Sequence, residues 1–165
     1  MQPVFDRLKG VKSTTVGYTG GTKGNPSYEE VSTGETGHAE AIEIVYDPAQ
    51  ISYPEILDAF WRSIDPTDAY GQFSDQGSQY RTAIFYQNED EKLQALESRE
   101  RLARTEKFDR PIVTEIVPAS KFYPAEEHHQ KYYLKNAGHY ALYKTGSGRE
   151  GFLKQKWGKE KGTGR

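Results

Sequence analysis

One stretch of the sequence, residues 34–46, constrains the fold most, because it joins a glycine-containing loop to a β-strand pattern. Side chains in a strand alternate between two faces, so Ile42, Ile44 and Tyr46 define one apolar face. Counting back by twos places Glu40 on that same face. The sequence therefore predicts a half-buried strand with a carboxylate at its loop end, on the side that faces the core.

A carboxylate in that position has two interpretations. Burial disfavours the ionised form of a carboxyl group and raises its pKa, which suits a general acid working near neutral pH. Alternatively, Glu40 accepts hydrogen bonds from backbone N–H groups and caps the loop. Structural carboxylates outnumber catalytic ones, so the pattern alone favours the capping role.

The rest of the chain predicts an α+β fold. Helices are expected at residues 1–9, 51–64 and 88–106, and further strands at residues 11–18, 81–86 and 112–117. Strands separated by helices, with one direct strand–strand link, favour a two-layer α/β sandwich with a mixed sheet and a ferredoxin-like core. We expect one domain at residues 1–140 and an irregular C-terminal tail, rich in Gly and Lys toward its end, at residues 141–165.

The composition excludes several classes of function. The 165 residues carry a formal net charge of −2, so nothing attracts the chain to nucleic acid or to a membrane surface. No apolar run reaches the roughly 20 residues of a membrane-spanning helix. The chain contains no cysteine, which excludes disulfides, thiolate zinc sites and cysteine nucleophiles within it. Its twelve tyrosines would suit a polar pocket lined by aromatic rings.

Three polar residues in two long loops are candidates to converge with Glu40. Tyr28 lies in the first loop, and Asp75 and Tyr80 lie in the second, where Tyr80 directly precedes a predicted strand. Two phenol donors and a protonated carboxylic acid would form a pocket for a strongly polarised oxygen atom. The alternative is that these tyrosines pack in ordinary loops with their hydroxyl groups in water.

Residues 126–129, with the sequence Glu-Glu-His-His, are a candidate metal site, to which His38 and Glu40 could add ligands. Adjacent histidines on a helix point about 100° apart and rarely share one ion. We therefore expect no metal, and a hydrogen-bonded structural role for His129. The Lys-rich end of the chain, near Trp157, is explained by a solvated tail, so we expect no nucleic-acid partner.

Several motifs resemble one known family in order and spacing. They are GYTGG at 17–21, NPSY at 25–28, TGHAEA at 36–41, DQGSQYRTAI at 75–84 and FYPAEEHHQ at 122–130. Together they make residues 1 to about 140 similar to the class A peptide methionine sulfoxide reductases.

The resemblance implies a reaction and a set of site residues. Family members reduce the S epimer of methionine sulfoxide, free or in proteins, and so repair oxidative damage. A cysteine thiolate attacks the sulfur, an acid protonates the oxygen, and a sulfenic acid remains. By this resemblance Glu40 is the acid, Tyr28 and Tyr80 hydrogen-bond to the sulfoxide oxygen, and Asp75 is the site aspartate. It also implies a cytoplasmic monomer without a bound cofactor, recycled by thioredoxin or dithiothreitol.

The sequence departs from the family at the nucleophile. The family carries Gly-Cys-Phe-Trp just before its first helix, whereas this chain begins at Met1, at that helix and without the preceding strand. Serine or threonine hydroxyls have a much higher pKa than a thiol and cannot replace it. We expect a truncated reductase that does not turn over as written. The alternative is a genuine short form, a non-catalytic module or pseudoenzyme that binds methionine sulfoxide or nothing.

Overall fold

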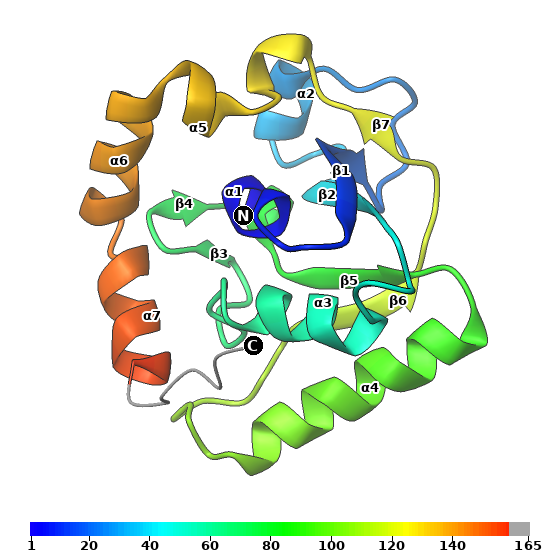
Figure 1. The fold of residues 1–165 in the computed structure, drawn as a ribbon. Helices are drawn as coiled ribbons and strands as arrows, with labels where there is room; N and C mark the ends of the chain where they lie inside the picture. The colour runs from blue at the N-terminus through cyan, green and yellow to red at the C-terminus, as the bar shows by residue number, and fades with distance from the viewer. Residues whose placement is uncertain (159–165) are drawn as a thin grey trace.

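The computed structural model describes residues 1–158, whose arrangement is shown in Figure 1. The helices are α1 (Gln2–Asp6), α2 (Tyr28–Ser32), α3 (Tyr53–Trp61), α4 (Glu89–Arg104), α5 (Tyr132–Lys135), α6 (Ala137–Gly146) and α7 (Arg149–Trp157), with 3-10 turns η1 (Ser78–Tyr80) and η2 (Glu127–His129). The strands are β1 (Val11–Thr19), β2 (Ala39–Tyr46), β3 (Gly71–Gln72), β4 (Asp75–Gln76), β5 (Ala83–Tyr86), β6 (Glu115–Pro118) and β7 (Tyr123–Pro124). The mixed α+β class expected from the sequence is confirmed.

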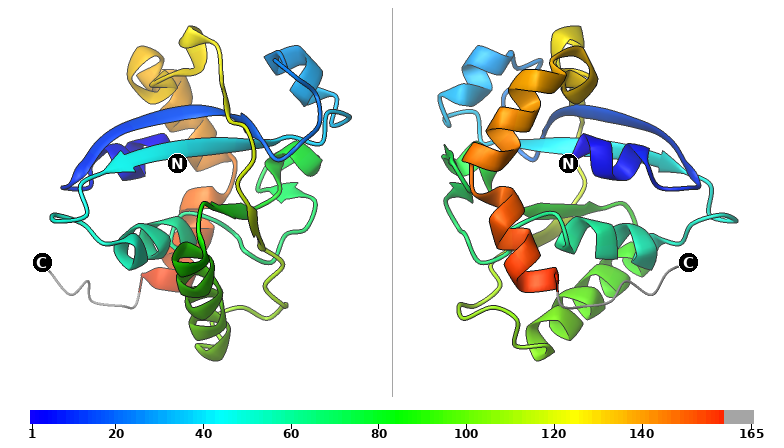
Figure 2. Two further views of the ribbon diagram at one scale, coloured as in Figure 1. Left: turned by 90° about the vertical axis from the view of Figure 1, so that its right-hand side faces the viewer. Right: turned by 60° about the vertical axis from the view of Figure 1, so that its left-hand side comes forward.

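The strands form small sheets rather than the one continuous sheet expected. β1 is the central strand of the order β2-β1-β7 and pairs antiparallel with both neighbours, with Tyr18 opposite Glu40 on one side and Tyr123 on the other. β5 and β6 pair in parallel, and β3 and β4 form a short antiparallel pair. In both views of Figure 2 the long β1–β2 pair lies on one side of the molecule, with α3 and α4 on the other and β5 between them.

Helices α3 and α4 were both expected from the sequence, and each begins after a residue whose side chain caps the helix. The N–H group of Glu55 donates to the Ser52 hydroxyl (3.2 Å), and the N–H group of Ser52 donates back to the Glu55 carboxylate (3.4 Å). The N–H group of Glu91 donates to the Asn88 side chain (2.9 Å) at the start of α4. These bonds satisfy N–H groups that a helix start otherwise leaves unpaired. Local sequence therefore sets where both helices begin.

Two clusters of buried side chains form the core, and α3 contributes to both. Leu57 and Trp61 pack toward α4 and β5, whereas Ile56 and Ala59 pack toward Phe5 of α1. The buried indole N–H of Trp61 donates to the hydroxyl of Ser98 in α4 (3.0 Å). The two faces of one short helix thus connect α1 on one side to α4 on the other.

The expectation of an irregular C-terminal tail is wrong as far as residue 157, because α6 and α7 are helical. The expected domain boundary after Tyr140 falls inside α6. Figure 1 shows α5, α6 and α7, in orange to red, running along one side of the molecule. Aromatic contacts hold this side: Phe152 of α7 packs on Phe73, with ring centroids 5.5 Å apart, and on Phe108. Residues 159–165 lie outside the described part of the chain.

Within residues 1–158, no helix combines the length and the hydrophobicity that crossing a membrane would require.

Candidate active site

A cavity of about 560 Å³ lies between the β1–β2 pair and the layer formed by α3 and β5. All four side chains expected at the site, those of Tyr28, Glu40, Asp75 and Tyr80, line this cavity. They come from α2, β2, β4 and η1, which are far apart in the sequence. The structure therefore brings together the residues that the motifs and the strand pattern singled out.

Glu40 lies at the loop end of β2, opposite Tyr18 of β1. Its side chain is exposed to solvent where it borders the cavity, whereas protein atoms surround the carboxyl group on its other sides. This burial, together with the negative charge of Asp75, raises the pKa of Glu40 to about 7. Within residues 1–158 no hydrogen bond reaches the carboxyl group, so it does not act as a backbone cap there.

Tyr80 presents a phenol to the same part of the cavity. Burial raises the pKa of Tyr80 far above its usual value of 10, and the nearby carboxyl groups of Glu40 and Asp75 raise it further. The hydroxyl group therefore stays protonated at all ordinary pH values and remains a hydrogen-bond donor. Asp75 itself accepts a hydrogen bond from the hydroxyl of Tyr143 in α6.

Tyr28 is the first residue of α2 and stands at the edge of the cavity, with 37 % of its surface exposed. A capping box between Ser27 and Glu30 starts this one-turn helix, with bonds of 3.2 and 2.9 Å. The backbone N–H of Tyr28 donates to the Glu126 carboxylate (3.2 Å), and its ring lies 4.6 Å from the ring of His129. The position of this phenol thus depends on the segment that follows β7.

Side-chain bonds tie η1 to the glycine-containing loop before β2. The Arg81 guanidinium donates to the Gly37 carbonyl (3.0 Å), and the Gln79 amide donates to the Ser32 carbonyl (3.3 Å). The Ser78 hydroxyl donates to the Gly34 carbonyl (3.3 Å). These bonds hold the loop that carries Tyr80 beside the loop that leads to Glu40.

His38 fixes the glycine loop from inside. It is 2 % exposed, and its Nδ1 accepts a hydrogen bond from the Gly21 N–H (3.0 Å), so Nε2–H donates to the Lys23 carbonyl (2.7 Å). Gly21 approaches the chain before β2 so closely that a Cβ there would lie 2.3 Å from the backbone nitrogen of His38. Both ring nitrogens are therefore occupied, and His38 is not available as the metal ligand that the sequence left open.

Sequence reasoning missed three residues at the site. Tyr18 faces Glu40 and donates a hydrogen bond to the Glu126 carboxylate (3.3 Å). Tyr143 holds Asp75, and Arg149 of α7 lines the cavity. Tyr18 belongs to the first family motif and could have been found there, whereas the last two come from the segment expected to be irregular.

The comparisons with known proteins identify one family. The model of the peptide methionine sulfoxide reductase family matches residues 1–161. The peptide methionine sulfoxide reductase MsrA of Bacillus subtilis is 51 % identical over 154 residues, which are 93 % of this chain and 87 % of the relative. The MsrA of Halalkalibacterium halodurans is 50 % identical over 159 residues, which are 96 % of this chain and 90 % of the relative.

Solved structures give the same result. The methionine sulfoxide reductase A of Corynebacterium diphtheriae superposes with a TM-score of 0.72 at 38 % identity, over 82 % of this chain and 69 % of that one. Reduced Mxr1 of Saccharomyces cerevisiae superposes with a TM-score of 0.76 at 31 % identity, over 82 % of this chain and 78 % of that one. The chain therefore belongs to the class A peptide methionine sulfoxide reductases, the peptide-methionine (S)-S-oxide reductase family.

Proposed function

We propose that this chain binds the S epimer of methionine sulfoxide with its oxygen toward Glu40, Tyr28 and Tyr80, and that the reducing thiol comes from outside the chain. The observation that carries the proposal is the raised pKa of Glu40, to about 7, in a cavity shared with two phenols. A carboxyl group with this pKa is partly protonated at neutral pH and can donate a proton to an oxygen atom.

Each residue has a defined task in this proposal. The phenols of Tyr28 and Tyr80 donate hydrogen bonds to the polarised sulfoxide oxygen, and the Glu40 carboxyl group protonates it, which makes the sulfur more electrophilic. Asp75 supports this step indirectly, because its negative charge raises the pKa of Glu40. A thiolate then forms a bond to sulfur while the sulfur–oxygen bond breaks. In balance, two thiols give up two electrons and two protons, and the products are methionine, a disulfide and water.

The missing part is the nucleophile, because the chain contains no cysteine. As written, the chain is therefore expected to bind methionine sulfoxide without reducing it. A non-catalytic binding module would behave in the same way. The groups proposed to bind the sulfoxide oxygen, Glu40, Tyr28 and Tyr80, support either a truncated reductase or a binding module. We assign the pocket to repair of oxidised proteins and peptides in a cytoplasmic monomer, with thioredoxin or dithiothreitol as the reductant of a thiol-containing form.

The deciding experiment compares three proteins with a peptide that contains methionine S-sulfoxide, in the presence of dithiothreitol. The 165-residue chain should bind the peptide without turnover. Extension at its amino end with the preceding strand and Gly-Cys-Phe-Trp should give reduction, and the matched extension with the same strand and Gly-Ser-Phe-Trp should not. The R epimer serves as the stereochemical control. Turnover by the cysteine-free chain, or no activity in the cysteine-extended one, would overturn the proposal.

Tyr28→Phe and Tyr80→Phe in the cysteine-extended chain test the two phenols separately. Each change removes one of several donors, so each should lower the rate of reduction less than Glu40→Gln does. A single Tyr→Phe change that abolishes the reaction would show that one phenol, and not Glu40, protonates the sulfoxide oxygen.

A further inference from the structure

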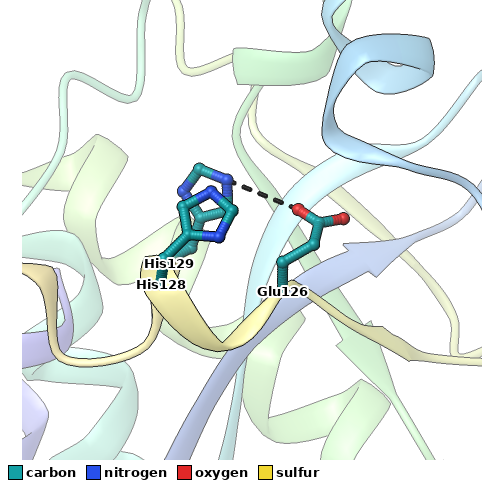
Figure 3. Close-up of side chains that lie close together, drawn as sticks. All are labelled: Glu126, His128 and His129. Carbon is teal, nitrogen blue, oxygen red and sulfur yellow. Dashed lines mark ion pairs between the residues drawn. The ribbon is translucent and has the colours of Figure 1, made fainter.

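The segment after β7 gathers three potential metal ligands, of which His129 lines the cavity. Glu126, His128 and His129 each offer one ligand atom, and these atoms all lie within 4.8 Å of one another (Figure 3). The two imidazole rings converge, with centroids 4.1 Å apart, although adjacent histidines on a regular helix were expected to diverge. The reason for expecting no metal therefore does not apply to this turn.

The separation of two of these atoms already matches a metal site. The Nε2 atom of His129 and a carboxylate oxygen of Glu126 are 3.4 Å apart. Two ligands of a tetrahedral zinc ion, each about 2.1 Å from the metal, are separated by about 3.4 Å. His128 is exposed, so its ring is free to turn toward the same point.

His129 supplies an independent observation. Its Nε2 atom is buried and has no hydrogen-bond partner within residues 1–158. Buried polar atoms are nearly always hydrogen-bonded, whereas this ring nitrogen makes an ion pair with the Glu126 carboxylate at 3.4 Å but no hydrogen bond, so an ion between the two groups would satisfy it. This nitrogen points toward the Glu126 carboxylate, as the dashed line in Figure 3 shows.

The surroundings of Glu126 orient its carboxylate in the way that outer groups orient metal ligands. The Tyr18 hydroxyl donates to one oxygen (3.3 Å), and the Tyr28 N–H donates to the other (3.2 Å). A carboxylate has about four acceptor positions, so these two bonds leave room for a metal. The His129 N–H donates to the Glu126 carbonyl (2.9 Å) and closes the turn that places the ligands together.

We propose that Glu126, His128 and His129 bind a divalent transition-metal ion of the zinc class through two imidazole nitrogens and one carboxylate oxygen. Nitrogen and oxygen ligands of this kind suit zinc and its neighbours rather than magnesium or calcium. A water molecule completes the coordination. The ion lies next to Tyr28 at the wall of the cavity but requires no group of the reductase reaction, so its binding is measurable without activity.

Titration calorimetry of the metal-free chain with zinc chloride, and the visible absorption of its cobalt(II) complex, test the site. The chain suits these probes, because it has no cysteine and only four histidines. His38 has both ring nitrogens occupied, and Tyr132 contacts the ring of His139. One zinc ion per chain and the absorption of a tetrahedral cobalt site are expected.

Variants identify the ligands. His128→Gln and Glu126→Gln should each raise the zinc dissociation constant by at least about 100-fold, since even outer-shell changes cost 10–100-fold. His139→Gln is the matched control and should leave binding unchanged. Because His128 is exposed, its variant should fold normally, which circular dichroism verifies. No zinc binding, binding unaffected by His128→Gln, or binding lost in His139→Gln would each overturn the proposal.

Discussion

The raised pKa of Glu40 predicts that Glu40→Gln stabilises the fold at alkaline pH. In the unfolded chain the carboxyl group ionises near its usual pKa of 4.5, whereas in the folded chain it holds its proton up to about pH 7. Between these values the folded state binds more protons than the unfolded state, so the free energy of unfolding falls as the pH rises. Below about pH 4.5 the group is protonated in both states and gives no penalty.

The size of this effect follows from the same shift. Each pKa unit corresponds to roughly 1.4 kcal/mol, so a rise from 4.5 to about 7 sets an upper limit of about 3 kcal/mol. Glu40 keeps contact with solvent in the cavity, and screening by water reduces the expected penalty to about 1–2 kcal/mol. Glutamine cannot ionise and avoids this penalty altogether.

Urea unfolding followed by tryptophan fluorescence measures the difference. Relative to the parent chain, Glu40→Gln should gain about 1–2 kcal/mol at about pH 8 compared with its value at about pH 4.5. Glu35→Gln, an exposed change in the loop before β2, is the control and should stay within about 0.5 kcal/mol at both pH values. Equal differences for Glu40→Gln at the two pH values would refute the reasoning that Glu40 is desolvated.

Three further predictions concern the reaction, the core and the C-terminal helices. In the cysteine-extended chain, Glu40→Gln should slow reduction of the sulfoxide peptide about 10²-fold or more, and an unchanged rate would remove Glu40 from the mechanism. Ser98→Ala leaves the buried Trp61 N–H without its acceptor and should lower the free energy of unfolding in urea by about 1–3 kcal/mol; no loss would mean that the N–H finds another partner. Tyr143→Phe removes the bond to Asp75 and should speed amide hydrogen exchange in α6 but not in α4, and equal rates in α6 would show that this bond does not hold the helix.

The part of the site nearest β2 was predictable because strand geometry is local. Side chains in a strand alternate between two faces, which is sufficient to place Glu40 on the same face as Ile42 and Ile44. In the structure Glu40 lines the cavity. The capping residues Ser52 and Asn88 were predictable for the same reason, since each acts within three residues of itself. Local rules were therefore sufficient to place Glu40 and the starts of the main helices.

The rest of the site depends on contacts between distant residues. Tyr143 reaches Asp75 across 68 positions, and α7 is held by aromatic packing on Phe73 and Phe108. The sequence of α6 and α7 is rich in glycine and lysine and has a weak apolar stripe, so no periodic pattern marks these helices. The convergence of His128 and His129 depends on side-chain rotation in a 3-10 turn, which sequence spacing does not determine.

The double role of α3 has a consequence for how the molecule unfolds. Because Ile56 serves one cluster and Leu57 the other, neither cluster keeps its packing if this helix leaves its place. Local opening is confined to a region only when its neighbours can stay intact without it. The end of α1 at Asp6 and the start of α4 at Glu89 are 83 positions apart along the chain, yet both helices depend on the nine residues of α3. The part of the molecule that holds α1, α3 and α4 should therefore open as one cooperative unit, with amide protection in α1 lost together with that in α4.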